Sequence, residues 1–226
     1  MIKLIKINVL GSYHVTNCYI IWDEKTKEAA IVDPADDAQK IIENIRDLNL
    51  KLKYVMLTHA HKDHTIALNE LLKNYDIKVI ASVDEAPMLE GKVNDCSDVF
   101  GLSQLPFDLS RFILLNDGEC FNIGDINIKI IHTPGHTKGS ACYYIEDEKI
   151  LLTGDTLFSD CFGRCDLDSA SIEDMANSLY NLYKNYNDVH IFPGHNLTNI
   201  NIKDTYPQIK ELLEHVAGVN LDELLK

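Results

Sequence analysis

The stretch YVMLTHAHKDH, residues 54–64, carries the strongest structural signal in this sequence. Its first four residues form an apolar run that predicts a buried strand. The seven that follow bring together His59, His61, Asp63 and His64 before a predicted helix. Imidazole and carboxylate are ligands that Zn, Fe and Mn share, so the cluster predicts metal binding. On a loop, His59 and His61 can turn to one centre while Asp63 and His64 turn to another. The alternative is a solvated loop that happens to be rich in histidine.

Three further candidate ligands follow predicted strands, where functional loops tend to lie. His136 ends the motif HTPGH, Asp155 ends TGD and His195 ends FPGH. The neighbouring Gly and Pro residues allow tight turns that aim the side chains. Each motif alone is weak, but with the first cluster they supply enough ligands for two metal sites. His132 and His190 precede two of these candidates, and we expect them to pack near the site rather than bind metal.

Short apolar runs alternate with helical patterns along the chain. The predicted strands are residues 3–9, 17–22, 29–33, 53–57, 78–80, 111–115, 127–132, 141–145, 150–153 and 189–192, and the predicted helices are residues 35–48, 66–75, 171–186 and 204–216. This order fits two sheets with helices packed outside, an α/β sandwich. Residues 84–110 are the least regular stretch, either a loop over a site or a long connection. No linker marks a boundary, so we expect one domain over residues 1–226.

Charge and composition limit the classes of partner. The 226 residues hold 21 Lys and Arg against 35 Asp and Glu, a formal net charge of −14. Nucleic acids and anionic membranes bind chiefly through cationic contacts, so we expect neither as a partner. The N-terminus lacks the pattern of a signal peptide, and no apolar run approaches the roughly 18 residues of a bilayer span. We therefore expect a cytoplasmic protein whose six cysteines are reduced.

The cluster THAHKDH, followed in order by His136, Asp155 and His195, resembles the metallo-β-lactamase superfamily over nearly the whole chain. The flanking motifs TNCY, TPGHT, GDTLF and GR most resemble its glyoxalase II branch, in particular short members similar to hydroxyacylglutathione hydrolases. This resemblance implies an αββα sandwich, two mixed sheets with helices on the outer faces and metals at one edge. That architecture agrees with the order of elements predicted above.

The resemblance also implies a dinuclear site and a hydrolytic reaction. One divalent metal is held by His59, His61 and His136, a second by Asp63, His64 and His195, and Asp155 bridges both. Zinc is the expected metal, with iron and manganese as alternatives. The shared hydroxide attacks a small thioester or related acyl substrate, and Asp63 and Asp155 act as catalytic residues that orient it.

One feature departs from glyoxalase II, which continues beyond its last histidine ligand with a helical domain that contacts glutathione. Here 31 residues follow His195. We therefore expect weak preference for glutathione. Contacts to the thiol carrier are expected from residues 84–110, from the Arg164 loop or from a partner subunit.

Other functions use the same scaffold. A mononuclear iron persulfide dioxygenase would use His59, His136 and Asp155, and counting metals separates it from the hydrolase. Lactone or β-lactam hydrolysis uses the same centre. A binding protein without activity is disfavoured because all seven ligand positions are filled, and a ribonuclease is disfavoured by the acidic charge.

Three residues near Asp155 have a weaker case. Arg164 can pair with a substrate carboxylate, or it can form an internal ion pair with Asp166 or Asp168. Cys161 and Cys165 flank it, and we expect them to be small buried residues rather than metal ligands.

Overall fold

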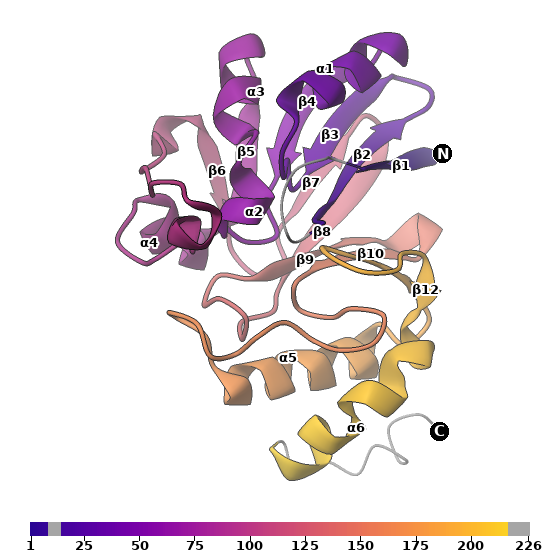
Figure 1. Ribbon diagram of the computed structural model, residues 1–226. Helices are drawn as coiled ribbons and strands as arrows, with labels where there is room; N and C mark the ends of the chain where they lie inside the picture. The colour runs from indigo at the N-terminus through magenta and orange to yellow at the C-terminus, as the bar shows by residue number, and fades with distance from the viewer. Residues whose placement is uncertain (9–14, 217–226) are drawn as a thin grey trace.

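The computed structural model describes residues 1–8 and 15–216, and they form four layers: helices, sheet, sheet and helices (Figure 1). The first sheet has the order β1 (Ile2–Asn8), β2 (Asn17–Asp23), β3 (Glu28–Val32), β4 (Lys51–Met56), β5 (Lys78–Ser82) and β6 (Phe112–Leu115). The second has the order β12 (Ile200–Asn201), β11 (His190–Pro193), β10 (Ile150–Gly154), β9 (Ala141–Ile145), β8 (Ile126–His132) and β7 (Cys120–Ile123). The predicted αββα sandwich is confirmed.

Both sheets are mixed. The strands β1, β2 and β3 pair antiparallel, whereas β3, β4, β5 and β6 pair in parallel. In the second sheet only the β10–β11 pair is parallel. Parallel strands end at the same edge of a sheet, so the loops that follow them meet there. Val32 of β3 pairs with Met56 of β4, which brings the segments after these two strands side by side.

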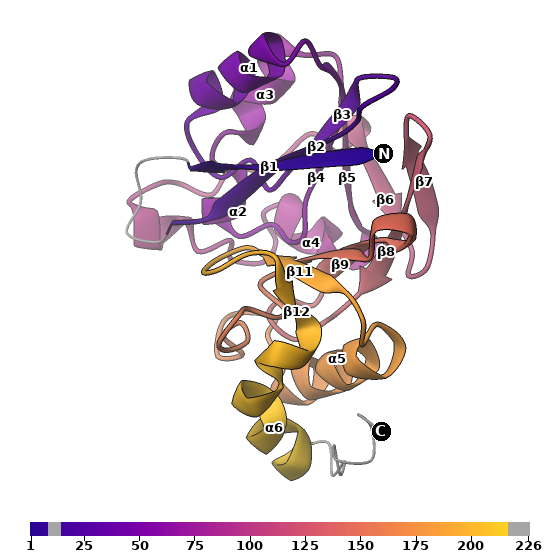
Figure 2. The ribbon, with the colours of Figure 1, turned by 90° about the vertical axis from the view of Figure 1, so that its right-hand side faces the viewer.

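Three apolar cores separate the four layers. Helices α1 (Ala38–Asp47) and α3 (Leu68–Asn74) cover the first sheet, and α5 (Ile172–Asn185) and α6 (Tyr206–His215) cover the second, as a 90° turn also shows (Figure 2). In β2, Ile20 packs toward α1 and α3, while Tyr19 and Ile21 pack between the sheets. Every residue of β2 is buried, because helices cover one face of its sheet and the second sheet covers the other.

The observed helices are shorter than their sequence patterns. The helix expected from residue 35 begins at Ala38, because Asp37 takes a left-handed conformation and its side chain accepts a hydrogen bond from the Lys40 amide. The helix expected over residues 66–75 is preceded by a separate turn, α2 (Lys62–Thr65). The helix expected from residue 204 begins at Tyr206, after a 3₁₀ turn over Ile202–Thr205.

Two strands, β7 and β12, were not predicted, since both are short edge strands whose pairing depends on a distant neighbour. Residues 84–110 are more ordered than their composition suggests. The stretch begins within a 3₁₀ turn over Val83–Glu85, which is followed by α4 (Ala86–Leu89). Two further 3₁₀ turns lie over Ser97–Phe100 and over Leu109–Arg111. The last residue of the first predicted strand, Val9, lies outside the described residues.

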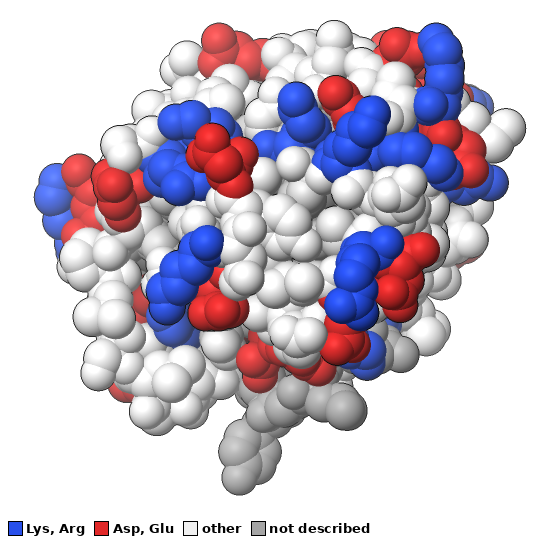
Figure 3. All heavy atoms as spheres, turned by 90° about the horizontal axis from the view of Figure 1, so that it is seen from above, with Lys and Arg blue, Asp and Glu red and all other residues white. Residues whose placement is uncertain are grey.

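The face formed by α1 and α3 mixes both signs of charge (Figure 3). Lysine and arginine side chains lie beside aspartate and glutamate, as in the ion pairs Arg46–Asp47 of α1 and Lys73–Glu70 of α3. Among the described residues, no helix is long and apolar enough to cross a bilayer.

Candidate metal centre

The histidine-rich loop begins where β4 ends and leads into α2, which Figure 1 places between α3 and the second sheet. Asp33, directly after β3, holds this loop. Its carboxylate accepts hydrogen bonds from the Thr58 amide at 2.8 Å and the Thr58 hydroxyl at 2.6 Å. It also lies 3.0 Å from Nδ1 of His64. The neighbouring ends of β3 and β4 therefore set the position of the loop and of the first turn of α2.

The second sheet supplies the remaining candidates. His136 lies between β8 and β9, and Asp155 and His195 follow the parallel strands β10 and β11. Gly194 allows their close approach. A Cβ atom at Gly194 would lie 2.3 Å from Oδ1 of Asp155 and 2.7 Å from Cε1 of His64, so a larger residue requires the site to shift.

All seven predicted ligands converge. They form three overlapping groups, in each of which the possible ligand atoms lie within 4.8 Å of one another: His59, His61 and His136; His59, His64 and Asp155; Asp63, His64 and His195. Asp155 lies between the first and third groups. Its Oδ1 is 3.3 Å from Nε2 of His64. Its Oδ2 is 3.5 Å from Nε2 of His136 and 3.3 Å from Nε2 of His195.

The residues fit divalent cations. Nε2 of His59, His61 and His64 and Oδ1 of Asp155 are buried and have no hydrogen-bond partner among the described residues. Leaving a buried polar atom unsatisfied costs about 1–3 kcal/mol, so four of them in one cluster call for an occupant. Nitrogen and carboxylate oxygen in this mixture suit a first-row divalent metal.

Four of the five histidines engage their second ring nitrogen outside the cluster; the exception is His61, whose Nδ1 lies 2.9 Å from Nε2 of His136. Nδ1 of His59 lies 3.1 Å from the Thr58 hydroxyl, and Nδ1 of His64 lies against Asp33. Nδ1 of His136 lies 2.8 Å from the carbonyl oxygen of Arg164, and Nδ1 of His195 lies 3.1 Å from that of Val15. Such partners fix the orientation of an imidazole and leave its second nitrogen facing a metal.

The electrostatics also match a cation site. Burial lowers the pKa of His59 well below its usual range and that of His61 to about 3, which keeps both rings neutral. Burial opposes ionisation of Asp63, but His64 lowers the pKa of this carboxyl to about 2. Burial also opposes protonation of His195, yet Asp155 and Asp63 raise its pKa to about 9. Neutral imidazoles beside ionised carboxylates are what metal binding requires, and a cation can replace the protons that the carboxylates attract.

Sequence reasoning missed two supporting carboxylates. Asp33 follows a strand, as the predicted ligands do, and this placement is the only signal that could have found it. Glu85 has no local signal. It is 2% exposed, and its carboxylate accepts hydrogen bonds from the Ala60 amide at 2.7 Å and the Thr137 hydroxyl at 3.0 Å. It thereby joins the loop of His59 to the loop of His136.

The structure separates the alternatives for Arg164. Its guanidinium forms two hydrogen bonds with Asp166, at 2.9 and 3.0 Å, and its side chain is exposed. The internal ion pair is therefore the arrangement observed. The predicted burial of the flanking cysteines was wrong: Cys161 is exposed and Cys165 is half-buried, because the loop that carries them runs along the surface.

The two remaining histidines differ. His132 is half-buried, with Nε2 3.2 Å from the carbonyl oxygen of Leu115 and Nδ1 3.7 Å from Asp84, consistent with the expected packing role. His190 is exposed at the start of β11, at the opposite end of this strand from His195, so its expected packing near the site was wrong.

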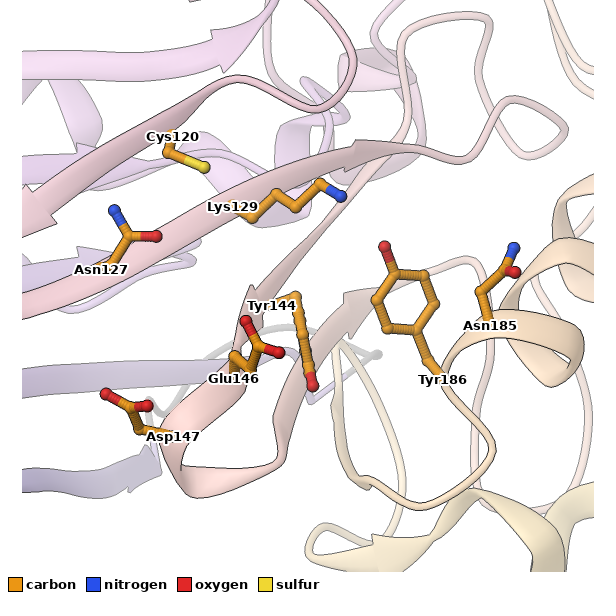
Figure 4. Close-up of a pocket in the computed structure, with 8 residues that line it drawn as sticks. All are labelled: Cys120, Asn127, Lys129, Tyr144, Glu146, Asp147, Asn185 and Tyr186. Atoms are coloured by element: carbon orange, nitrogen blue, oxygen red, sulfur yellow. The ribbon is translucent and has the colours of Figure 1, made fainter.

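A cavity of about 310 Å³ lies over the cluster and is lined by His61, Asp63, His136, Asp155 and His195 among others. A larger hollow of about 580 Å³ lies between β7, β8, β9 and the end of α5 (Figure 4). Tyr144, Tyr186 and Lys129 line that hollow, and none of the predicted ligands does. Chemistry rather than size therefore locates the candidate site.

Comparison with known proteins agrees with this fold and site. Residues 12–202 match the family model described as the Metallo-beta-lactamase superfamily, and the chain belongs to that superfamily. It is similar to hydroxyacylglutathione hydrolase GloC from Haemophilus influenzae, with 32% identity over 180 residues that cover 79% of this chain and 84% of GloC. The resemblance to the glyoxalase II branch is thereby confirmed.

Two further proteins show the breadth of the superfamily around this chain. The probable polyketide biosynthesis zinc-dependent hydrolase PksB from Bacillus subtilis is 30% identical over 207 residues, which cover 91% of this chain and 82% of PksB. The crystal structure of BLEG-1 B3 metallo-beta-lactamase superposes with a TM-score of 0.81 at 28% identity and covers 93% of this chain and 99% of its own. The chain is thus a member of a metallo-hydrolase superfamily with a histidine-rich site.

Proposed function

We propose that this chain is a dinuclear metal-dependent hydrolase that cleaves a small thioester or a related acyl substrate. The observation that carries the proposal is the position of Asp155, within 3.5 Å of ligand atoms from two groups. Buried ring nitrogens in both groups lack hydrogen-bond partners among the described residues. One cation in each group would satisfy these atoms, and Asp155 would contact both.

The ligand sets follow from the groups. His59, His61 and His136 would hold one cation, Asp63, His64 and His195 the other, and Asp155 both. Zinc is the proposed metal, since the similar PksB is described as zinc-dependent. Iron and manganese accept the same ligands and are tested beside it.

The chain's own residues would position the reaction. Two bound cations lower the pKa of a shared water toward neutrality and polarise the substrate carbonyl. Asp63 lines the cavity, and its Oδ2 accepts a hydrogen bond from the Thr16 hydroxyl at 3.0 Å. The Asp63 carboxylate would accept a hydrogen bond from the attacking water and orient it.

A thioester suits this site for a chemical reason. A thiolate leaves without first taking up a proton, whereas an alkoxide or an amide nitrogen needs a general acid. The name of the relative GloC, a hydroxyacylglutathione hydrolase, supports the same substrate class.

Metal analysis combined with a substrate panel tests the proposal. Protein purified without added metal is loaded with Zn, Mn or Fe and assayed on a thioester, a lactone and a β-lactam. We expect two metal ions per chain and turnover of the thioester. His59→Ala and His195→Ala should each lose about one equivalent of metal, because each removes a ligand of a different group.

His190→Ala is the matched control, because His190 is exposed and lies outside the ligand groups. It should retain both ions. A wild-type stoichiometry that stays at one ion in excess metal would contradict the dinuclear site and favour the mononuclear iron oxygenase. Two bound ions without thioester turnover would overturn the substrate class.

A further inference from the structure

The wall of the cavity above the candidate metal centre is apolar. Beside the predicted ligands, its lining includes five large apolar side chains, Val99, Phe100, Phe158, Phe162 and Leu167, together with Cys96, Cys161, Gly163 and Arg164. The five apolar side chains come from two segments, the 3₁₀ turn over Ser97–Phe100 and the loop between β10 and α5. Both segments lie outside the sheets, so the wall is a feature of the connections rather than of the layers of the sandwich.

The mouth of the cavity extends this apolar surface. Val99 is 66% exposed on the cavity wall. An exposed apolar side chain at the opening of a cavity with an apolar wall is available to contact an apolar ligand.

The cavity offers no unpaired cation from the described chain to an anionic substrate. Arg164 is the only lysine or arginine among its lining residues, and both of its bonded nitrogens hold Asp166. A substrate carboxylate could displace Asp166, but that exchange replaces one exposed ion pair with another and leaves Asp166 unpaired. Exposed pairs contribute little to binding in any case.

We propose that the substrate of this site is a thioester or ester with an apolar acyl chain, joined to a leaving group that carries no net negative charge. The inference rests on the proposed hydrolase function. The acyl chain lies against Phe100 and Leu167, and its carbonyl lies over the candidate metal centre at the base of the cavity. Glutathione, which carries an excess of negative charge, finds no free partner there.

Acyl-chain length provides the test. The metal-loaded full chain is assayed on acetyl, butyryl, hexanoyl and octanoyl thioesters of N-acetylcysteamine, and on the same acyl groups carried by glutathione. We expect kcat/KM to rise about fourfold for each methylene that the cavity buries. At equal acyl length, the uncharged carrier should be cleaved at least as efficiently as glutathione.

Variants separate the cavity wall from general effects on the enzyme. Phe100→Ala and Leu167→Ala should each lower the ratio of octanoyl to acetyl kcat/KM by about tenfold, because each removes apolar contact with the longer chain. Leu105→Ala is the matched control, since Leu105 is 59% exposed in the same connection and does not line the cavity. Its chain-length profile should equal that of the wild type.

The outcomes distinguish this inference from the proposed function. A flat chain-length profile, or a hundredfold preference for glutathione at equal acyl length, would overturn the apolar substrate while hydrolysis stands. Absence of turnover on every thioester by the fully loaded protein would overturn the hydrolase instead. In that case calorimetry with an uncleavable S-octyl thioether of N-acetylcysteamine still reports on the cavity, and binding weakened by Phe100→Ala would support an apolar ligand.

Discussion

Asp155 lies between the group of His59, His61 and His136 and the group of Asp63, His64 and His195. It is 8% exposed, its Oδ1 faces His64, and its Oδ2 faces His136 and His195. Burial opposes its ionisation, but His64 and His195 hold its pKa well below the usual range. The carboxylate is therefore ionised and directed to the place where two cations would lie.

Asp155→Asn keeps the shape of this side chain and removes its charge. We expect kcat/KM for thioester hydrolysis to fall by at least about 100-fold and metal content to decrease, because the bridging ligand is weakened. Asp168→Asn, at an exposed aspartate of the following loop, should change neither. Full metal loading with retained turnover in Asp155→Asn would remove Asp155 from the bridging role.

Glu85 couples stability to pH. Burial raises the pKa of its carboxyl to about 7, although hydrogen bonds from the Ala60 amide and the Thr137 hydroxyl oppose this shift. The folded protein holds this proton more tightly than the unfolded chain, so protonation of Glu85 stabilises the folded state. This contribution to the free energy of unfolding is complete below about pH 4.5 and is lost as the pH rises through about 7.

Glu85→Gln mimics the protonated carboxyl at every pH. We expect the variant to be more stable than the wild type by about 3 kcal/mol at pH 8, and this difference to vanish toward pH 4.5. Urea unfolding of both proteins across this pH range measures the difference, in which metal effects common to both cancel. A difference that does not change with pH would show that Glu85 is ionised in the folded protein.

The candidate site is built from the loops that follow strand ends. The geometry of a single turn therefore sets the spacing of the candidate ligands. The turn after β11 carries Gly194 between Asp155 and His64. The parallel pairing of β10 and β11 brings this turn beside the end of β10. A larger residue in this turn would push two ligands apart without touching any of the three cores.

Gly194→Ala should therefore weaken metal binding by about 10- to 100-fold while the far-UV circular dichroism spectrum stays unchanged. The comparison variant is Gly101→Asn. Gly101 has a φ of 66°, which asparagine tolerates, and a Cβ atom there would meet no atom within 4 Å. Metal affinity equal to the wild type in Gly194→Ala would show that the turn can move away at little cost.

At the scale of the whole molecule, a net charge of −14 acts on any charged substrate. A glutathione thioester approaches a chain that repels it, and salt screens this repulsion. We expect kcat/KM for the glutathione thioester to rise severalfold between about 20 mM and about 500 mM NaCl. The uncharged N-acetylcysteamine thioester of the same acyl group should show little change. A fall with salt for the glutathione thioester would reveal a cationic binding site.

The predictable part of the fold lies in local patterns. The apolar run ending at Leu57 and the polar cluster from His59 to His64 are contiguous, so strand, loop and candidate ligands are visible together in the sequence. Likewise His136 and His195 follow apolar runs through Pro-Gly turns. Local alternation and turn chemistry also indicated two sheets with helices outside, and those layers are confirmed.

The sequence by itself thus determined the layered fold and the list of candidate ligands. Each strand, helix and ligand motif is visible as a pattern within a short stretch of consecutive residues. Only the tertiary structure decided that Glu85 joins the loops of His59 and His136 and that the cavity has an apolar wall. The edge strands β7 and β12 belong with these features. The physical reason is that such contacts form between distant segments, and the free energy that selects them comes from packing and burial that no short stretch of sequence contains.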